Sequence, residues 1–388
     1  MEFSRKIMEI KPSATLSITS KAKAMLAAGE DIIILAAGEP DFDTPEIIKK
    51  AGIDRINKGH IKYTPAGGTK SLKEAICRKL KNDNNLDYSI NEIVVSNGAK
   101  HSLYNVLQVI CNPEDEVLVI SPYWVSYPEM VKLAGGVPRV LQTRVENGFK
   151  LIPEQLEAAL NEKTKALILN SPSNPAGVVY DKQELEKIAG ICSKTGIVVI
   201  SDEIYEKIIF DNKKHFSIAA VSDKIRALTV VVNGLSKSYS MTGWRIGYLA
   251  ADKELVSKVS TLQSHATSNP CSVSQAAAEF ALTSDLEEEM KMNCLEFQKR
   301  RDSLIEMFSD EKRLKPFKPE GAFYLFCDVS KFGMDSMMFA QRLLEEEKVA
   351  VIPGGPFGDD RFIRISFAAD METIKLGVNR IKSWVKKI

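Results

Sequence analysis

The sequence carries almost no excess of either charge. Its 388 residues include 52 lysines and arginines against 51 aspartates and glutamates, so the formal net charge is +1 at pH 7. Nucleic acids and anionic membranes attract proteins with a marked basic excess, so we expect neither as a partner. The longest apolar runs, such as Ile32–Ala37 and Ala227–Val232, are far shorter than the roughly 20 residues that a transmembrane helix needs.

Signals for export and for a metal or disulfide framework are also missing. No terminal segment joins a basic stretch, an apolar stretch and a small-residue cleavage site, so we expect a cytoplasmic protein without a secretion signal. The six cysteines form no C-x-x-C pair and have no histidine partners at metal-ligand spacing, so we expect reduced structural thiols and no metal. They are Cys77, Cys111, Cys192, Cys271, Cys294 and Cys327.

The middle of the chain alternates short β-branched runs with longer amphipathic stretches. The runs predict buried strands, and stretches such as 71–81 and 183–193 predict helices between them. The predicted strands are 92–95, 115–120, 165–169, 197–200 and 228–232. This alternation indicates an α/β fold with a mostly parallel sheet flanked by helices on both faces.

The pattern changes after about residue 275, and no repeat or linker divides the chain. A charged helix, 284–307, leads into short strands at 323–327, 350–352 and 362–367 and then a closing helix. We therefore predict two domains, since 388 residues exceed what one core usually serves. Residues 45–280 would form the large domain, and residues 1–44 with 281–388 a smaller α+β domain.

Four polar clusters stand at the ends of the predicted strands. In open α/β sheets, ligands bind outside the carboxyl ends of the strands, so the clusters predict a site there. They lie at 96–100, 170–175, 201–205 and 236–238.

Lys237 follows the apolar run 229–232 and should lie near the interior. Burial disfavours a charged ammonium and lowers its pKa, and a neutral amine is what Schiff-base chemistry requires. Arg245 and Ser236 could hold a phosphate through charge and a hydroxyl. The alternative is a solvated lysine in a surface turn, which is the commoner state of a single lysine.

Asp202 ends a predicted strand and should be partly buried, so a cation is expected to face it. A protonated pyridine nitrogen would serve, and Tyr205 could offer its hydroxyl to a ring oxygen on the same side. The alternative for Asp202 is a helix cap.

Other residues at these strand ends could bind a phosphate, a flat ring or a carboxylate. The turn Gly98-Ala99-Lys100 opens a predicted helix, 101–110, whose free N–H groups suit an anion. Trp124 could stack on a flat ring or lie in the core, and Asn174 sits in a rigid loop between two prolines. Arg364 lies among apolar strand residues and calls for a carboxylate partner.

The segment Ser236–Tyr248 resembles the pyridoxal-phosphate (PLP) lysine signature of class I, fold type I aminotransferases. Segments 36–42, 170–177 and 201–206 resemble further motifs of that family in the same order, and the similarity covers nearly the whole chain. The resemblance implies that residues 45–280 form a PLP-binding domain and that the smaller domain closes over the substrate.

The resemblance implies a role for each cofactor residue. Lys237 would hold PLP as a Schiff base and move a proton at the substrate Cα. Asp202 would pair with the ring nitrogen, Tyr205 with the phenolic oxygen, and Trp124 would stack on the ring. The phosphate would be held by Ser236, Arg245, Gly98, Ala99, Lys100 and, from the neighbouring subunit of a homodimer, Tyr63.

The resemblance also implies how the substrate is bound. Arg364, assisted by Gly38 and Asn174, would hold the α-carboxylate, with Trp124 nearby. Residues 11–15, together with 121–130 and Lys100, resemble the bacterial and archaeal branch of aspartate aminotransferases, in which no partner-subunit arginine meets the second carboxylate. Consistent with that resemblance, no arginine lies between Asp252 and Lys299.

In that branch a lysine and hydroxyls meet the second carboxylate. The candidates are Lys100, Ser13 and Thr15, with a helix-start lysine and a local cap as the alternatives. Lys11 resembles the lysine that accompanies prephenate activity, although a lysine near a terminus is usually solvated. Ala176, where relatives often carry threonine, departs from the family pattern.

The predicted function is ping-pong transamination from L-aspartate to 2-oxoglutarate, giving oxaloacetate and L-glutamate. The alternatives are a bifunctional aspartate/prephenate aminotransferase, an aromatic aminotransferase, or a lyase on the same fold. A non-enzymatic PLP-sensing regulator would carry an N-terminal DNA-binding module, for which the roughly ten residues before Lys11 leave no room.

Overall fold

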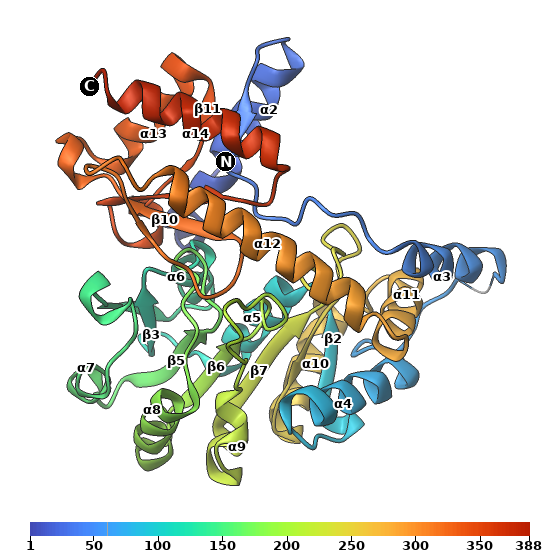
Figure 1. The fold of residues 1–388 in the computed structure, drawn as a ribbon. Coiled ribbons are helices and arrows are strands. Elements are labelled where there is room, and N and C mark those ends of the chain that lie inside the picture. Colours follow the sequence, from blue (N-terminus) through green and yellow to red (C-terminus); the bar gives the residue numbers. More distant parts are fainter. Residues whose placement is uncertain (60) are drawn as a thin grey trace.

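The computed structural model describes residues 1–59 and 61–388 (Figure 1). Its centre is a seven-stranded sheet in the order β2-β8-β7-β6-β5-β3-β4. β8 runs antiparallel to β2 and β7, and the other neighbours are parallel, which confirms the mostly parallel α/β sheet. The strands are β2 (Ile93–Ser96), β3 (Glu116–Ser121), β4 (Val137–Gln142), β5 (Thr164–Asn170), β6 (Val198–Asp202), β7 (Thr229–Gly234) and β8 (Gly247–Ala250).

Helices cover both faces of this sheet because successive strand residues point to opposite sides. On β5, Leu167 packs into a cluster with residues of α8, whereas Ile168 packs with residues of α5 and α10. The helices around the sheet are α3 (Glu46–Asn57), α4 (Lys70–Asn84), α5 (Ala99–Ile110), α6 (Ser126–Leu133), α7 (Pro153–Ala159), α8 (Lys182–Thr195), α9 (Asp223–Leu228), α10 (Lys253–Ala266) and α11 (Ser272–Thr283). Since both faces are buried, the strands are apolar runs rather than alternating ones.

α8 shows how local chemistry sets the helix ends. Asp181 accepts a hydrogen bond from the Glu184 N–H while the Glu184 carboxylate accepts from the Asp181 N–H, which forms a capping box. Gly196 ends the helix in the left-handed region at φ 77°. The helix therefore extends one residue before and two beyond the predicted range 183–193.

The remaining elements gather around a smaller sheet of order β12-β13-β10-β9, which is antiparallel throughout. Its strands are β9 (Lys315–Phe317), β10 (Tyr324–Asp328), β12 (Ile352–Pro353) and β13 (Phe362–Ser366). β1 (Ile33–Ile34) pairs in parallel with β11 (Val349–Ala350) and so ties the N-terminal segment to this part of the chain. The helices here are α1 (Arg5–Met8), α2 (Ala14–Ala27), α12 (Glu287–Met307), α13 (Ser336–Glu347) and α14 (Met371–Val385).

Figure 1 shows the two groups at opposite ends of the molecule, with α12 spanning between them. The single strand predicted at 350–352 is wrong: Ala350 ends β11 and Ile352 begins β12, so the chain changes sheets at Val351. The division into residues 45–280 and residues 1–44 with 281–388 stays a prediction. Across the described residues, no helix combines the length and apolarity that a bilayer crossing requires.

Gly247 lets β8 lie directly against the start of α5. A Cβ atom at this position would overlap the Ala99 nitrogen and the Gly98 carbonyl carbon. Because backbone cannot move aside as a flexible side chain can, a larger residue must displace the turn that begins α5.

We expect Gly247→Ala to destabilise the fold by about 2 kcal/mol or more, since overpacking against backbone is not easily relieved. Gly190→Ala is the matched control, because a Cβ at this exposed position in α8 meets nothing within 4 Å. That change should stabilise by up to about 1 kcal/mol through helix propensity. Urea unfolding of both variants measures this, and equal stability would contradict the packing argument.

Candidate active site

The carboxyl ends of β5 and β6 place the first site residues side by side. Asn170 and Asp202 end these strands and are partners in the parallel register. The Asn170 side chain donates to the Asp202 carbonyl at 2.9 Å, and its own oxygen accepts from the Asn174 N–H at 2.9 Å. The loop that carries Asn174 is thereby fixed to the strand that carries Asp202.

Asp202 is a buried carboxylate without a cation. Its exposed fraction is 4%, and within the described chain no lysine, arginine or histidine forms an ion pair with it. Oδ2 accepts the Tyr127 hydroxyl at 2.6 Å and Oδ1 accepts the Ile204 N–H at 3.2 Å. Burial raises the pKa of Asp202 to about 6, against the opposing effect of these two hydrogen bonds.

Lys237 lies in the loop after β7, where its side chain is only partly exposed. Its Nζ donates to the Gly38 carbonyl and lies 5.9 Å from the centre of the Tyr205 ring. Burial lowers its pKa to about 8; Arg364 and Arg245 act in the same direction, and Glu39 opposes them. The shift has the direction that the sequence predicted.

Tyr205 follows Asp202 in a turn and is buried. Its hydroxyl lies 2.9 Å from the hydroxyl of Tyr324, a residue of β10. The two tyrosines therefore join the end of the large sheet to the smaller sheet. Sequence reasoning missed Tyr324, which lies 119 residues further along the chain.

An anion cradle forms where the Arg245 guanidinium meets the start of α5. Its Nη2 donates to the Asn97 carbonyl at 3.2 Å and its Nη1 to the Thr242 carbonyl at 2.9 Å. Gly98 has φ 87°, and a Cβ there would overlap the guanidinium, so glycine permits the approach. Ser236, also predicted here, is buried. A guanidinium beside free helix N–H groups suits a phosphate.

Trp124 and Lys100 lie beside this cradle. The Lys100 Nζ is 4.7 Å from the centre of the Trp124 ring, and Trp124 meets Tyr127 edge-on at 5.3 Å. Desolvation and the neighbouring Arg245 lower the pKa of Lys100. No acidic group in the described chain forms an ion pair with Lys100.

Like Asp202, Arg364 is a buried charge that has no counter-ion in the part of the chain that the structure describes. It lies in β13 with 1% of its surface exposed, and burial lowers its pKa. Its Nη1 donates to Asn174 Oδ1 at 3.0 Å and its Nη2 to the Ala36 carbonyl at 3.1 Å. Its Nε is buried and has no partner among the described residues. The centres of two aromatic rings lie beside the guanidinium, Tyr324 at 4.2 Å and Phe357 at 5.1 Å.

The segment 36–38 connects the two cationic groups. Arg364 binds the Ala36 carbonyl and Lys237 binds the Gly38 carbonyl, two residues further along. A carboxylate that completes the Arg364 guanidinium would therefore lie close to the Lys237 amine. Such an arrangement suits an α-amino acid, whose carboxylate is bonded directly to its Cα.

Four predicted residues lie outside this cluster of contacts. Tyr63 has an exposed fraction of 90%, and the Lys11 backbone N–H donates to Glu129 of α6 at 3.1 Å. Ser13 accepts from the Leu16 N–H and caps α2, which is the local role that its alternative described. The Thr15 hydroxyl is buried and has no partner in the described chain.

Two acidic residues, Glu203 and Glu206, directly follow Asp202 and Tyr205 in the chain. Glu203 lies 2.9 Å from His215 Nε2, and Glu206 accepts from Lys79 and from Asn84, the latter at 2.8 Å. Lys79 and Asn84 belong to α4, so these contacts anchor the turn of residues 203–206 to that helix. The carboxylate oxygens of Glu203 and Glu206 already have protein hydrogen-bond partners, so we assign no metal to these residues.

The amino-acid sequence is similar to those of known aminotransferases over nearly its whole length. Residues 30–381 match the family model described as "Aminotransferase class I and II". Aspartate aminotransferase of Bacillus sp. (strain YM-2) is 49% identical over 98% of both chains. "Probable aspartate/prephenate aminotransferase" of Rickettsia conorii is 46% identical, over 99% of this chain and 98% of its own.

A solved structure agrees with the sequence comparisons. Aspartate aminotransferase from Thermus thermophilus, solved with maleate, has a TM-score of 0.95 and 39% identity and covers 98% of this chain and 99% of its own. The chain therefore belongs to the class I and II aminotransferases, which are PLP-dependent enzymes that act on amino acids and 2-oxo acids.

Proposed function

We propose that this protein transfers the amino group of L-aspartate to 2-oxoglutarate by a ping-pong mechanism, giving oxaloacetate and L-glutamate. The observation that carries this proposal is Arg364, a buried guanidinium whose Nε has no partner and which pairs with no carboxylate among the described residues. It shares the segment 36–38 with Lys237. A substrate carboxylate at Arg364 supplies the missing charge.

The residues fit PLP. The cradle of Arg245, Gly98 and buried Ser236 suits its phosphate. No described residue gives the Asp202 carboxylate the cationic partner that a protonated ring nitrogen would provide. Tyr205 would reach the phenolic oxygen, and the Trp124 ring would lie against the cofactor ring. When bound, PLP withdraws electrons and stabilises negative charge at the substrate Cα.

Lys237 would hold the cofactor and then carry the proton at the substrate Cα. With a pKa of about 8, roughly half of its amine is neutral at pH 8. An ordinary lysine with a pKa near 10.4 would be only about 0.4% neutral at that pH. Burial therefore supplies an amine that can act both as nucleophile and as base.

Arg364, with Asn174 and the backbone at Gly38, would bind the substrate α-carboxylate. For the second carboxylate we propose Lys100, a cation beside Trp124, with Thr15, Ser13 and Lys11 as further candidates. The Thermus thermophilus relative was solved with maleate, which is a dicarboxylate, and this supports a dicarboxylic substrate.

We also propose a homodimer with shared active sites, in which Tyr63 completes the phosphate site of the neighbouring subunit. Tyr63 is almost fully exposed, and α3 nearby exposes Ile47, Ile53 and Ile56. A second copy of the chain would cover such apolar side chains. A cytoplasmic location stays a prediction.

Prephenate is a second candidate amino acceptor. The specific support is the name of the Rickettsia conorii relative and of further relatives at 44–46% identity. The side chain of Lys11, the residue linked to this activity by resemblance, is exposed. Incubation with prephenate and L-glutamate tests it directly by the 2-oxoglutarate formed.

The Arg364→Lys variant tests the function. Lysine keeps the charge but loses the planar pair of donors, so kcat/KM for L-aspartate should fall about 100-fold, as a loss of 2–3 kcal/mol implies. The absorbance of the lysine-linked cofactor should change little, because the substituted lysine keeps the positive charge that Arg364 presents to Lys237. Undiminished kcat/KM in a coupled oxaloacetate assay would contradict the assignment.

Lys100→Met is the matched variant for the other end of the substrate. It should lower kcat/KM for L-aspartate while leaving that for L-alanine, which has no second carboxylate, within about twofold. Equal losses for both amino acids would instead place Lys100 at the cofactor phosphate alone.

The pH dependence of stability tests the burial of Asp202. Its folded pKa of about 6 lies above the ordinary value of 3.8, so its contribution to stability is complete below pH 4 and is lost as the pH rises through 6. In cofactor-free protein, Asp202→Asn should therefore gain in melting temperature relative to wild type between pH 4 and pH 7.

The exposed Asp223→Asn is the control for this series and should follow the wild-type curve. With PLP bound the order should reverse, because asparagine cannot balance a cationic ring nitrogen. Parallel melting-temperature curves for wild type and Asp202→Asn across this pH range would contradict the raised pKa of Asp202.

A further inference from the structure

Tyr127 makes a close side-chain contact with Asp202, the carboxylate proposed to pair with the cofactor ring. It lies in α6 with 2% of its surface exposed, and its hydroxyl donates to Asp202 Oδ2 at 2.6 Å. That distance is typical of a hydrogen bond from a hydroxyl to a charged oxygen. In the described chain no other side chain donates to Asp202.

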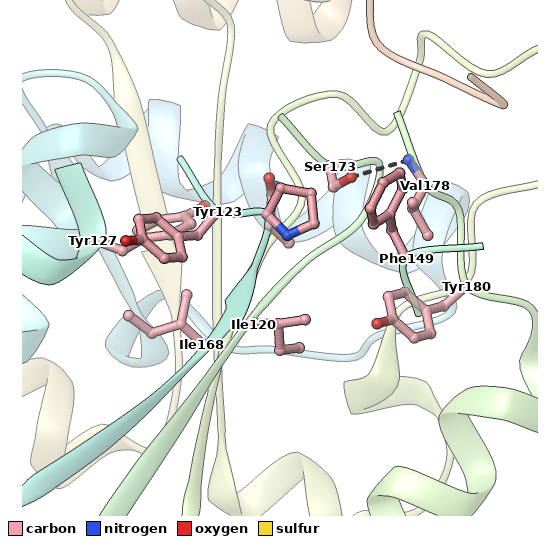
Figure 2. A pocket seen from close by; sticks show the side chains of 10 residues that line it. Ile120, Tyr123, Tyr127, Phe149, Ile168, Ser173, Val178 and Tyr180 are labelled. Atoms are coloured by element: carbon pink, nitrogen blue, oxygen red, sulfur yellow. Dashed lines mark hydrogen bonds between the residues drawn. The ribbon is translucent and has the colours of Figure 1, made fainter. Parts of the chain in front are cut away.

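The surroundings fix the ring of Tyr127. It meets Trp124 edge-on, at an interplanar angle of 81°, one helical turn away. On another side it borders a pocket that is also lined by Ile120, Ile168 and Tyr180, and Figure 2 shows Tyr127 at one end of this pocket and Tyr180 at the other. The residue proposed to lie against the cofactor ring and the residue that holds Asp202 therefore belong to the same turn of chain.

The chemistry of a tyrosine suits this position. Burial and the Asp202 carboxylate raise the pKa of Tyr127 well above its ordinary value, so the hydroxyl keeps its proton and remains a donor. A lysine, arginine or protonated histidine in its place would neutralise Asp202 and compete with a cationic ring nitrogen. A neutral donor orients the carboxylate and favours its charged form without cancelling the charge.

We propose that Tyr127 is a positioning residue of the cofactor site, which acts through Asp202 to keep that carboxylate charged and directed at the ring nitrogen. This inference rests on the proposed function. Each carboxylate oxygen accepts one protein hydrogen bond, from Tyr127 or from the Ile204 N–H. Because a carboxylate offers about four acceptor sites, room remains for the ring nitrogen.

Tyr127→Phe tests the proposal, with Tyr180→Phe as the matched control. Tyr180 is buried in the wall of the same pocket, but its hydroxyl accepts the Leu151 N–H at 2.8 Å and makes no contact with Asp202. Both variants lose one buried hydroxyl and its hydrogen bond, so a purely structural role predicts similar changes in each.

Two measurements distinguish a positioning role of Tyr127 from a purely structural one. Tyr127→Phe should weaken PLP binding about tenfold, as loss of one charge-assisted hydrogen bond implies. It should also raise the midpoint pH of the colour change of the lysine-linked cofactor, because a ring nitrogen that holds its proton less firmly repels a proton on the linkage less. Tyr180→Phe should leave both unchanged.

A double-mutant cycle keeps the proposal testable if Tyr127→Phe loses stability. In an Asp202→Asn background, adding Tyr127→Phe should not weaken PLP binding further, because the residue acts through the carboxylate. Additive losses, or unchanged PLP affinity and midpoint in Tyr127→Phe, would overturn the proposal. A wild-type protein that forms no lysine-linked band would contradict the proposed function itself, so the two failures are distinguishable.

Discussion

The site depends on a carboxylate that is buried at the end of a central strand and forms no ion pair with a cation in residues 1–59 and 61–388. The last residue of β6, Asp202, is held by two neutral donors, Tyr127 and the Ile204 backbone, and neither cancels its charge. Arg364 is the complementary case, a buried guanidinium whose hydrogen-bond acceptors among the described residues are both neutral. Leaving both charges unmatched costs stability, and the natural explanation is that a cofactor and a substrate supply the missing partners.

The fold allows these charges to remain apart. Asp202 belongs to the large sheet and Arg364 to β13 of the smaller sheet, so each is fixed by a different hydrogen-bonded ladder. Many contacts join the two parts, including backbone hydrogen bonds between residues 208–210 and 320–322, and two of them lie among the site residues: Tyr205 meets Tyr324, and Arg364 meets Asn174. These are polar contacts at the site itself, so ligand binding and the relative placement of the two sheets should be linked.

The strands and several site residues could be predicted from the sequence because apolar runs and the polar residues that follow them mark where strands end. Apolar runs placed the strands, and the polar residue after each run placed Asp202, Lys237 and Asn174 at one edge of the sheet. Arg364 was predictable for a similar reason, as a charge inside an apolar strand needs a partner. The resemblance to aminotransferases supplied the roles, which spacing alone left open.

The parts that could not be predicted come from contacts between distant segments. Tyr127 lies 75 residues before Asp202, and a tyrosine one helical turn after Trp124 is indistinguishable in sequence from an ordinary core residue. Tyr324 sits in a strand of aromatic and aliphatic residues and has no polar neighbour that marks its hydroxyl. The break at Val351 was missed because a buried apolar run gives no sign of where a chain changes sheets.

The nitrogen-15 chemical shift of ring-labelled PLP bound to the protein tests the central claim most directly. If Asp202 balances a cationic ring nitrogen, the shift should be that of a protonated pyridine from pH 6 to pH 9 in wild type and that of a neutral pyridine in Asp202→Asn. A neutral shift in wild type, or the same shift in both proteins, would contradict the account.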